Sequence, residues 1–171
     1  MLQSHEFWMA QACQLARKGL YTTHPNPRVG CVLVKEAQKI GEGFHLKAGE
    51  AHAEINALNS TEVDPTGATA YVTLEPCSHQ GKTGPCAEAL IKAKVKTVVF
   101  GMQDPNPEVA GNGLNKLKAA GIEVIGPVLE LECAQLNPGF IKRMQEGLPF
   151  VRLKMAMSLD GRTAMESGES K

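Results

Sequence analysis

Helices and strands are predicted to alternate through the second half of this chain, and this alternation limits the possible fold more than any other feature of the sequence. Apolar runs predict strands at 68–74, 95–101 and 122–125, and apolar residues at helical spacing predict helices at 86–93 and 113–120. Strands connected by helices pair in parallel, with helices on both faces of the sheet. The sequence therefore predicts an α/β fold with three layers, α/β/α.

The rest of the chain adds a hairpin and further helices to this sheet. Two antiparallel strands are predicted at 29–34 and 39–46, and helices at 4–19 and 52–59. One or two closing helices are predicted at 129–144, where an Asn-Pro-Gly sequence interrupts the helical pattern. The expected sheet is therefore mixed, with about five strands.

The last residues follow a different pattern. From 151 to 158 apolar and polar residues alternate, which predicts a half-buried strand, and a polar run then continues to Lys171. A strand without a neighbouring strand is unstable. We therefore assign 1–147 to one domain and 148–171 to the truncated start of a second domain. The alternative is an extra edge strand on the first domain.

The charge of the chain argues against nucleic acid as a partner. Lys+Arg and Asp+Glu number 18 each, so the formal net charge is zero, whereas nucleic-acid binders usually carry a basic excess or a basic stripe. Aromatic residues, on which unpaired bases stack, make up only 5% of the chain. The densest group of lysines is expected to form a solvated surface: Lys92, Lys94, Lys96, Lys116 and Lys118.

Neither a membrane segment nor an export signal is predicted. The apolar runs are shorter than the roughly 18 residues that a spanning helix needs, and the N-terminal residues lack the apolar core of a signal peptide. Five cysteines, an odd number, also argue against a framework of disulfides. We therefore expect a cytoplasmic protein without a membrane partner. Three of its cysteines are expected to fill the core: Cys13, Cys31 and Cys133.

Three residues have the type and order of zinc ligands. His52 begins a predicted helix, and Cys77 and Cys86 each follow a proline. One imidazole and two thiolates suit Zn²⁺, and three protein ligands leave one position open for water. Zinc lowers the pKa of such a water to about 7, which provides a hydroxide nucleophile at neutral pH. The helix N-termini at His52 and Cys86 would offset part of the negative charge.

Glu54 is the predicted proton shuttle of this site. It lies two residues after His52, close enough to face the open position without binding the metal. A carboxylate there can take a proton from the water and deliver it to a ring nitrogen and then to leaving ammonia. The order of these residues resembles the pattern of hydrolytic zinc deaminases. The alternatives are a closed zinc site with His79 as fourth ligand, or cysteines that only fill the core, and both leave Glu54 without a role beside the metal.

Longer segments closely resemble the riboflavin-biosynthesis pyrimidine deaminase/reductase family, and the resemblance covers the whole chain. The inter-cysteine loop is its most specific part, because cytidine and tRNA-adenosine deaminases usually hold these cysteines at Cys-x-x-Cys. One departure is Gly84, where the family commonly has proline. The matching segments are His24–Gly30 (HPNPRVG), His52–Glu54 (HAE), Thr73–Cys86 (TLEPCSHQGKTGPC), Asp104–Pro107 (DPNP) and Ala110–Gly113 (AGNG).

The resemblance implies a cytidine-deaminase-like fold, a substrate and the residues that contact it. The substrate would be 2,5-diamino-6-ribosylamino-4(3H)-pyrimidinone 5′-phosphate, which would lose its 2-amino group as ammonia. A loop with Lys82 and Thr83 can offer a cation and a hydroxyl to the phosphate. Asp104 and Asn106 follow the strand predicted at 95–101, and the carboxyl end of a strand is where open α/β sheets place ligands. The residues implied to contact the substrate are Asn26, His45, Ala53, Lys82, Thr83, Asp104 and Asn106.

The tail resembles the entrance to the family's second domain, a reductase that uses NADPH. The matching segments are 153–161 and 167–170. The resemblance implies that Ala156 lies against NADP and that Ser170 touches the sugar substrate. Because the remaining reductase is absent from these residues, we expect reductase activity only in a full-length, bifunctional protein. Members of this family often associate with copies of themselves, so the resemblance also allows for a homo-oligomer.

Three other functions remain open on the sequence alone. The chain could deaminate a cytosine nucleoside or nucleotide, or it could be a zinc-stabilised interaction module without catalysis. A deaminase that edits RNA or DNA is a third alternative, against which the zero net charge and the low aromatic content both argue.

Overall fold

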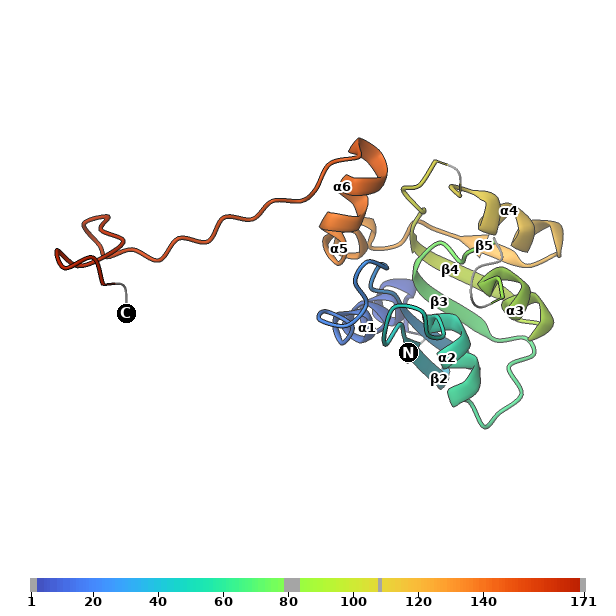
Figure 1. Cartoon of the computed structure of the whole chain (residues 1–171). Helices are drawn as coiled ribbons and strands as arrows, with labels where there is room; N and C mark the ends of the chain where they lie inside the picture. Colours follow the sequence, from blue (N-terminus) through green and yellow to red (C-terminus); the bar gives the residue numbers. More distant parts are fainter. Residues whose placement is uncertain (1–2, 79–83, 108, 170–171) are drawn as a thin grey trace.

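A five-stranded sheet lies between two layers of helices in the part of the chain that the structure describes (Figure 1). This computed structural model describes residues 3–78, 84–107 and 109–169. The predicted three-layer α/β/α fold with a mixed sheet is confirmed. The strands, in the spatial order β2-β1-β3-β4-β5, are β1 (Gly30–Lys35), β2 (Gln38–Phe44), β3 (Thr69–Leu74), β4 (Thr97–Met102) and β5 (Glu123–Ile125).

The strand directions bring distant segments to one end of the sheet. Strand β1 pairs antiparallel with both β2 and β3, while β3, β4 and β5 pair in parallel. The start of β1 therefore lies beside the carboxyl ends of β2, β3 and β4. The segments that follow Phe44, Leu74 and Met102, and the segment that precedes Gly30, all meet there. We call this end of the sheet the ligand end.

The helices divide between the two faces of the sheet. Side chains that alternate along β1 show the division, since Val32 packs in one apolar cluster and Leu33 in the other. The first cluster contains residues of α1 and α5, with α6 packed at its margin. The second contains residues of α2, α3 and α4. The helices are α1 (His5–Arg17), α2 (Ala53–Ser60), α3 (Cys86–Lys92), α4 (Asn112–Ala119), α5 (Glu130–Gln135) and α6 (Pro138–Glu146).

Helix α2 lies against the backbone of β2 because glycine occupies the contact. A Cβ atom on Gly43 would lie 2.4 Å from the backbone nitrogen of Ala57. Only a residue without a side chain allows this approach. The contact fixes the height of α2 over the sheet, and thereby places His52, the N-cap of α2, at the ligand end.

The predicted distribution of cysteines and lysines is confirmed. Cys13, Cys31 and Cys133 are buried, and the Sγ atoms of Cys13 and Cys133 lie 3.5 Å apart between α1 and α5. Four of the five clustered lysines are exposed, and the fifth, Lys116, pairs with Glu88 on the surface. No helix in residues 3–78, 84–107 and 109–169 is long and apolar enough to span a membrane.

The strand predicted at 151–158 is wrong for this chain. Residues 148–169 form an extended arm that leaves the end of α6 (Figure 1). Val151 and Leu153 are each 81% exposed, and the segment has no regular secondary structure. An alternating pattern becomes a strand only when a neighbouring strand pairs with its N–H and C=O groups. The alternative, an extra edge strand on the first sheet, is also wrong, because the arm pairs with none of the five strands.

Candidate functional site

The three predicted zinc ligands lie together at the ligand end. The ligand atoms of His52, Cys77 and Cys86 all lie within 4.8 Å of one another. The Nδ1 atom of His52 is 3.2 Å from the Sγ of Cys86 and 3.6 Å from the Sγ of Cys77. Tetrahedral zinc, with bonds of about 2.0 Å to nitrogen and about 2.3 Å to sulfur, separates such ligands by about 3.5 Å. The donor set and its spacing therefore fit a zinc ion.

Each ligand is positioned by the end of an element. His52 is the N-cap of α2, Cys86 is the first residue of α3, and Cys77 follows the end of β3. The backbone N–H of Cys86 donates to the Sγ of Cys77 at 3.3 Å, which joins α3 to the segment after β3. The three ligands are thus carried by two helices on one face and by the central strand.

The hydrogen bond between the two thiols favours the thiolate form of Cys77 and the protonated form of Cys86. Donation from the Cys86 thiol, together with the hydrogen bond to His52, lowers the pKa of Cys77 to about 4. The same contact with Cys77, together with burial, raises the pKa of Cys86. Hydrogen bonding to Cys77 also raises the pKa of His52. A second thiolate so close to the first needs a cation beside it, and a divalent metal ion supplies that charge.

Glu54 shares this environment and is buried in it. Its side chain is only 3% exposed, at the second residue of α2, and it lines the same cleft as His52 and Cys77. Burial raises the pKa of Glu54 to about 7, and the charge on Cys77 acts in the same direction. A carboxyl group in such a position can both accept and release a proton near neutral pH.

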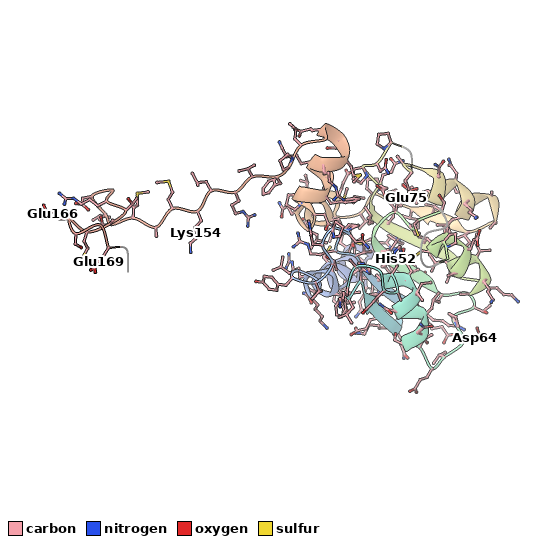
Figure 2. The ribbon with its side chains drawn as sticks, in the orientation of Figure 1. His52, Asp64, Glu75, Lys154, Glu166 and Glu169 are labelled. Atoms are coloured by element: carbon pink, nitrogen blue, oxygen red, sulfur yellow. The ribbon has the colours of Figure 1, made fainter. Side chains whose placement is uncertain are left out.

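A cleft of about 520 Å³ opens at the ligand end, beside the three ligands and Glu54. Its walls come from segments that are far apart in sequence, as the strand directions require. Figure 2 shows the labelled His52 and Glu75 within the domain, whereas Lys154, Glu166 and Glu169 lie out on the arm. Four of the residues that the family resemblance implied line this cleft: Asn26, His45, Asp104 and Asn106.

A chain of hydrogen bonds fixes Asn26 and His45. The Nδ1 atom of His45 lies 3.1 Å from the carbonyl oxygen of Ala51, which can only accept, so Nδ1 carries the proton. The Nε2 atom is then the acceptor for the Asn26 amide, whose Nδ2 lies 3.2 Å away. Burial lowers the pKa of His45, in agreement with a neutral ring. The Asn26 amide keeps its oxygen for a ligand that donates hydrogen bonds.

The remaining residues that the family resemblance implied lie in several parts of the chain. Asp104 accepts from the backbone N–H of Asn106 at 2.9 Å, which shapes the loop after β4. The side chain of Ala53 is fully buried in the core, so only its backbone could meet a ligand. Ala156 lies exposed on the arm. The predictions for His79, Lys82, Thr83 and Ser170 fall outside the described residues.

Helix α6 forms a wall of the cleft that the sequence did not predict. Phe140 and Met144 on this helix line the cleft. Just before the helix, the buried Asn137 makes two hydrogen bonds to the backbone of Arg28. Its Oδ1 accepts from the N–H at 2.7 Å, and its Nδ2 donates to the C=O at 2.8 Å. Arg28 and Asn137 are 109 residues apart in the sequence, and no local pattern predicts a contact over such a separation.

Glu75 was also missed, although it lies two residues before a predicted ligand. It is 3% exposed and lines the cleft, and its carboxylate accepts hydrogen bonds from four backbone N–H groups. The signal in the sequence was a charged residue between an apolar strand and Pro76, a position where an unpaired carboxylate would be buried at high cost.

Comparisons with known proteins agree with this site. Residues 2–102 match the family described as the cytidine and deoxycytidylate deaminase zinc-binding region. The matched segment contains His52, Glu54, Cys77 and Cys86 but ends at the last residue of β4. The loop with Asp104 and Asn106, and helices α4 to α6, lie beyond it.

Proteins of riboflavin biosynthesis resemble the chain over most of its length. It is 58% identical to the riboflavin biosynthesis protein RibD of Escherichia coli (strain K12), over 96% of this chain and 45% of that protein. The chain thus spans about half the length of this relative. It is also 49% identical to the diaminohydroxyphosphoribosylamino-pyrimidine deaminase of Buchnera aphidicola subsp. Schizaphis graminum, over 84% of this chain and 97% of that protein.

A solved structure gives the same result for the fold. Form 1 of Acinetobacter baumannii RibD superimposes with a TM-score of 0.94 at 61% sequence identity, over 100% of this chain and 48% of that chain. The likeness therefore includes α4 to α6, which the matched family segment does not reach.

Proposed function

Because the chain belongs to the zinc-binding cytidine and deoxycytidylate deaminase family, and within it to the diaminohydroxyphosphoribosylaminopyrimidine deaminases of riboflavin biosynthesis, we propose that it deaminates 2,5-diamino-6-ribosylamino-4(3H)-pyrimidinone 5′-phosphate. One observation carries the proposal above all others. His52, Cys77 and Cys86 surround one point, and Glu54 faces the cleft that opens beside it. This arrangement suits attack by water on a polarised ring carbon, and it suits few other reactions.

We propose zinc as the metal and His52, Cys77 and Cys86 as its protein ligands. The fit rests on the donor types and on the separations of 3.2 Å and 3.6 Å from the histidine nitrogen to the two sulfurs. When bound, zinc supplies a Lewis acid that lowers the pKa of water towards neutrality. His79 lies outside the described residues and is not needed for this site, because an open fourth position is what catalysis requires.

The proposed role of Glu54 is to move protons. The reaction adds water across the double bond between the ring carbon that bears the 2-amino group and the adjacent ring nitrogen, and then breaks the bond from that carbon to the amine. Glu54 accepts one proton of the attacking water and passes it to the adjacent ring nitrogen, and it then carries the second proton, from the hydroxyl now on the ring carbon, to the amine that leaves as ammonia. The oxygen of water remains on the ring as a carbonyl, so atoms and charge balance.

The proposed substrate contacts follow from the walls of the cleft. The Asn26 oxygen can accept from an amino group of the ring, with His45 holding the amide in place. Asp104 and Asn106 offer acceptors and a donor to the ribosyl hydroxyls from the loop after β4. We assign the remaining contacts to the backbone of Ala53 and, for the phosphate, to Lys82 and Thr83 in the inter-cysteine loop.

The arm supports a proposed division of the chain at 1–147 and 148–171. The helical layers end with α6, whose C-cap is Gly147, and the residues that follow are exposed. Because the chain spans 45% of the Escherichia coli relative, we propose that 148–171 open a second, NADPH-dependent reductase domain, with Ala156 and Ser170 in its site. The five free cysteines support a cytoplasmic location.

Ammonia release tests the proposed function directly. The zinc-loaded chain is incubated separately with the diaminopyrimidine ribosyl phosphate, with cytidine and with dCMP, and the zinc content of the same sample is measured. We expect one zinc per chain and turnover of the diaminopyrimidine substrate alone. Activity confined to cytidine or dCMP would contradict the proposed substrate, and full zinc loading without turnover of any of the three would favour a non-catalytic zinc module.

A further inference from the structure

Glu75 is a buried carboxylate that the proposed chemistry does not use. It follows the last residue of β3, and its own N–H donates to the C=O of Met102, the last residue of β4, at 2.9 Å, which extends the pairing with β4 one residue past the end of β3. Two residues later comes Cys77, one of the proposed metal ligands. The backbone of Glu75 is thus part of the sheet, while its side chain reaches towards the segment that follows β4.

Four backbone N–H groups meet the two oxygens of this carboxylate. The Oε2 atom accepts from Asp104 at 3.3 Å and from Gly111 at 2.9 Å. The Oε1 atom accepts from Gly113 at 2.9 Å and from Leu114 at 3.4 Å. With both oxygens occupied in this way, Glu75 has no free lone pair directed at a metal or a reacting proton. Its position in the cleft wall therefore calls for a different role.

The four donors bracket the loop that carries Asp104 and Asn106. Asp104 stands at the start of that loop, and Gly111 stands at its end as the N-cap of α4. A glycine N-cap has no side chain with which to satisfy the first N–H groups of its helix. The Glu75 carboxylate takes that place from the segment after β3, and its negative charge lies at the positive end of α4.

The close packing of α4 on this segment points the same way. A Cβ atom on Gly113 would lie 1.9 Å from the carbonyl oxygen of Pro76. The first turn of α4 therefore rests directly on the backbone between Glu75 and Cys77. One short stretch of chain, from 75 to 77, holds the helix and the loop on one side and the metal ligand on the other.

We propose that Glu75 is a positioning residue, which fixes the loop carrying Asp104 and Asn106 at a set distance from the metal centre and so determines how tightly the substrate binds. The substrate part of this inference rests on the proposed function. The side chains of Asp104 and Asn106 are only partly buried, whereas Glu75 is 3% exposed, so Glu75 ties this loop to the buried part of the domain. Loss of the carboxylate should weaken substrate binding and leave the chemical step nearly unchanged.

The test uses the zinc-loaded chain with Glu75→Gln, which keeps the shape of the side chain but turns one oxygen into an NH₂ group facing backbone donors. We expect one zinc per chain, a rise in KM of about tenfold or more, as for the loss of one hydrogen bond to a charged group, and a kcat within about threefold of the parent. Hydrogen exchange at the amides of Gly111, Gly113 and Leu114 should accelerate by a similar factor. Glu132→Gln, on the exposed surface of α5, is the matched control.

Other outcomes would overturn the inference. Loss of zinc, or a fall in kcat at constant KM, would place Glu75 in the metal site or in the chemistry, and unchanged KM and exchange rates would deny it any positioning role. If Glu75→Gln does not fold, Gly111→Ala decides, because it strains the loop at φ +81° and leaves the carboxylate intact. A raised KM then supports the inference and an unchanged KM rejects it. Should the parent chain fail to turn over the substrate, the proposed function fails, and amide exchange alone still decides whether Glu75 anchors the loop.

Discussion

Two buried glutamates line one cleft, and their surroundings give them opposite tasks. Glu75 meets four backbone N–H groups, so its charge is held in place by the chain. Glu54 is buried beside the Cys77 thiolate, and burial raises its pKa to about 7. A carboxylate that is fully hydrogen-bonded anchors structure, whereas one that is poorly stabilised as an anion exchanges protons readily. The environment of each side chain therefore supports the proposed roles, with Glu54 as the proton carrier and Glu75 as the anchor.

Glu54→Gln tests the proton carrier. The amide has nearly the same shape but cannot take a proton from water, so kcat for ammonia release should fall by about 10²- to 10⁴-fold. Zinc content should remain at one per chain, because the glutamate is not among the three clustered ligands. Steady-state kinetics and metal analysis on the same preparation measure both quantities. Glu132→Gln serves as the control, and unchanged turnover would remove Glu54 from the mechanism.

For single residues, the sequence predicted the site where the partners lie close together along the chain. His52 and Glu54 stand two residues apart, and Cys77 and Cys86 stand nine residues apart, so the order of residue types was enough to predict them. The donors to Glu75 lie 29 to 39 residues away and are backbone amides. Backbone groups have no residue type, so no pattern of letters could have identified this contact.

At the scale of elements, the site is an assembly of strand ends and helix starts. The reversed direction of β1 puts the loop with Asn26 beside the carboxyl ends of β2, β3 and β4. Helix α2 reaches this end because it lies on the bare backbone of β2 at Gly43. Helix α6 closes one wall, and Asn137 ties the loop before β1 to it. The position of each functional group thus depends on a contact between elements.

Gly43→Ala should disturb the contact between α2 and β2. The added Cβ would meet the backbone nitrogen of Ala57 at 2.4 Å, and backbone cannot move aside as a flexible side chain can. We expect the free energy of unfolding to fall by about 2 kcal/mol, as measured by urea denaturation of the zinc-loaded chain. Gly84→Ala is the matched control, since a Cβ there meets open space. Equal midpoints for the two variants would contradict the close packing of α2.

Asn137→Ala should loosen the loop that carries Asn26. The change removes two hydrogen bonds to Arg28 and leaves its N–H without that partner, which should cost about 1–3 kcal/mol of stability. Because Asn26 lies two residues before Arg28, KM should also rise. Denaturation and steady-state kinetics measure the two effects, with the exposed Gln145→Ala on α6 as the control. A loss of stability with no change in KM would show that Asn137 supports the fold alone.

Most elements were predictable because their signals are local. Helical spacing and apolar runs depend on neighbouring residues, and the predicted strands and helices from 4 to 144 all correspond to observed elements. The segment at 151–158 has an equally clear alternation, and yet it forms no strand. A strand depends on a partner elsewhere in the chain, so its own pattern is necessary but not sufficient.

At the scale of the whole molecule, the layered domain and the arm differ in how they are held. The domain is built around two apolar clusters on the two faces of one sheet. The arm exposes Val151, Leu153 and Met157 to solvent and adds no residue to either cluster. The domain should therefore keep its structure and its cleft without the arm.

Removal of residues 148–171 tests this independence. We expect the 1–147 variant to bind one zinc, to release ammonia at the rate of the parent, and to melt within about 2 °C of it, which corresponds to under 1 kcal/mol for a domain of this size. Differential scanning calorimetry and the ammonia assay measure these quantities. A variant that keeps Phe150, which lies against Gly139, is the matched control. A large loss of stability in both variants would show that the arm belongs to the first domain.

The direction of the strands also places the opposite end of the sheet far from the described part of the cleft. The described residues of the cleft gather at the ligand end, whereas the turn at Glu36 and Ala37 and the loops at 61–68, 93–96 and 120–122 lie at the other. This asymmetry makes the molecule a convenient scaffold for engineering. A peptide tag or a fluorescent reporter inserted between Glu36 and Ala37 would lie a full strand length from the cleft. Such an insertion would change the hairpin turn and leave the residues of the cleft in place.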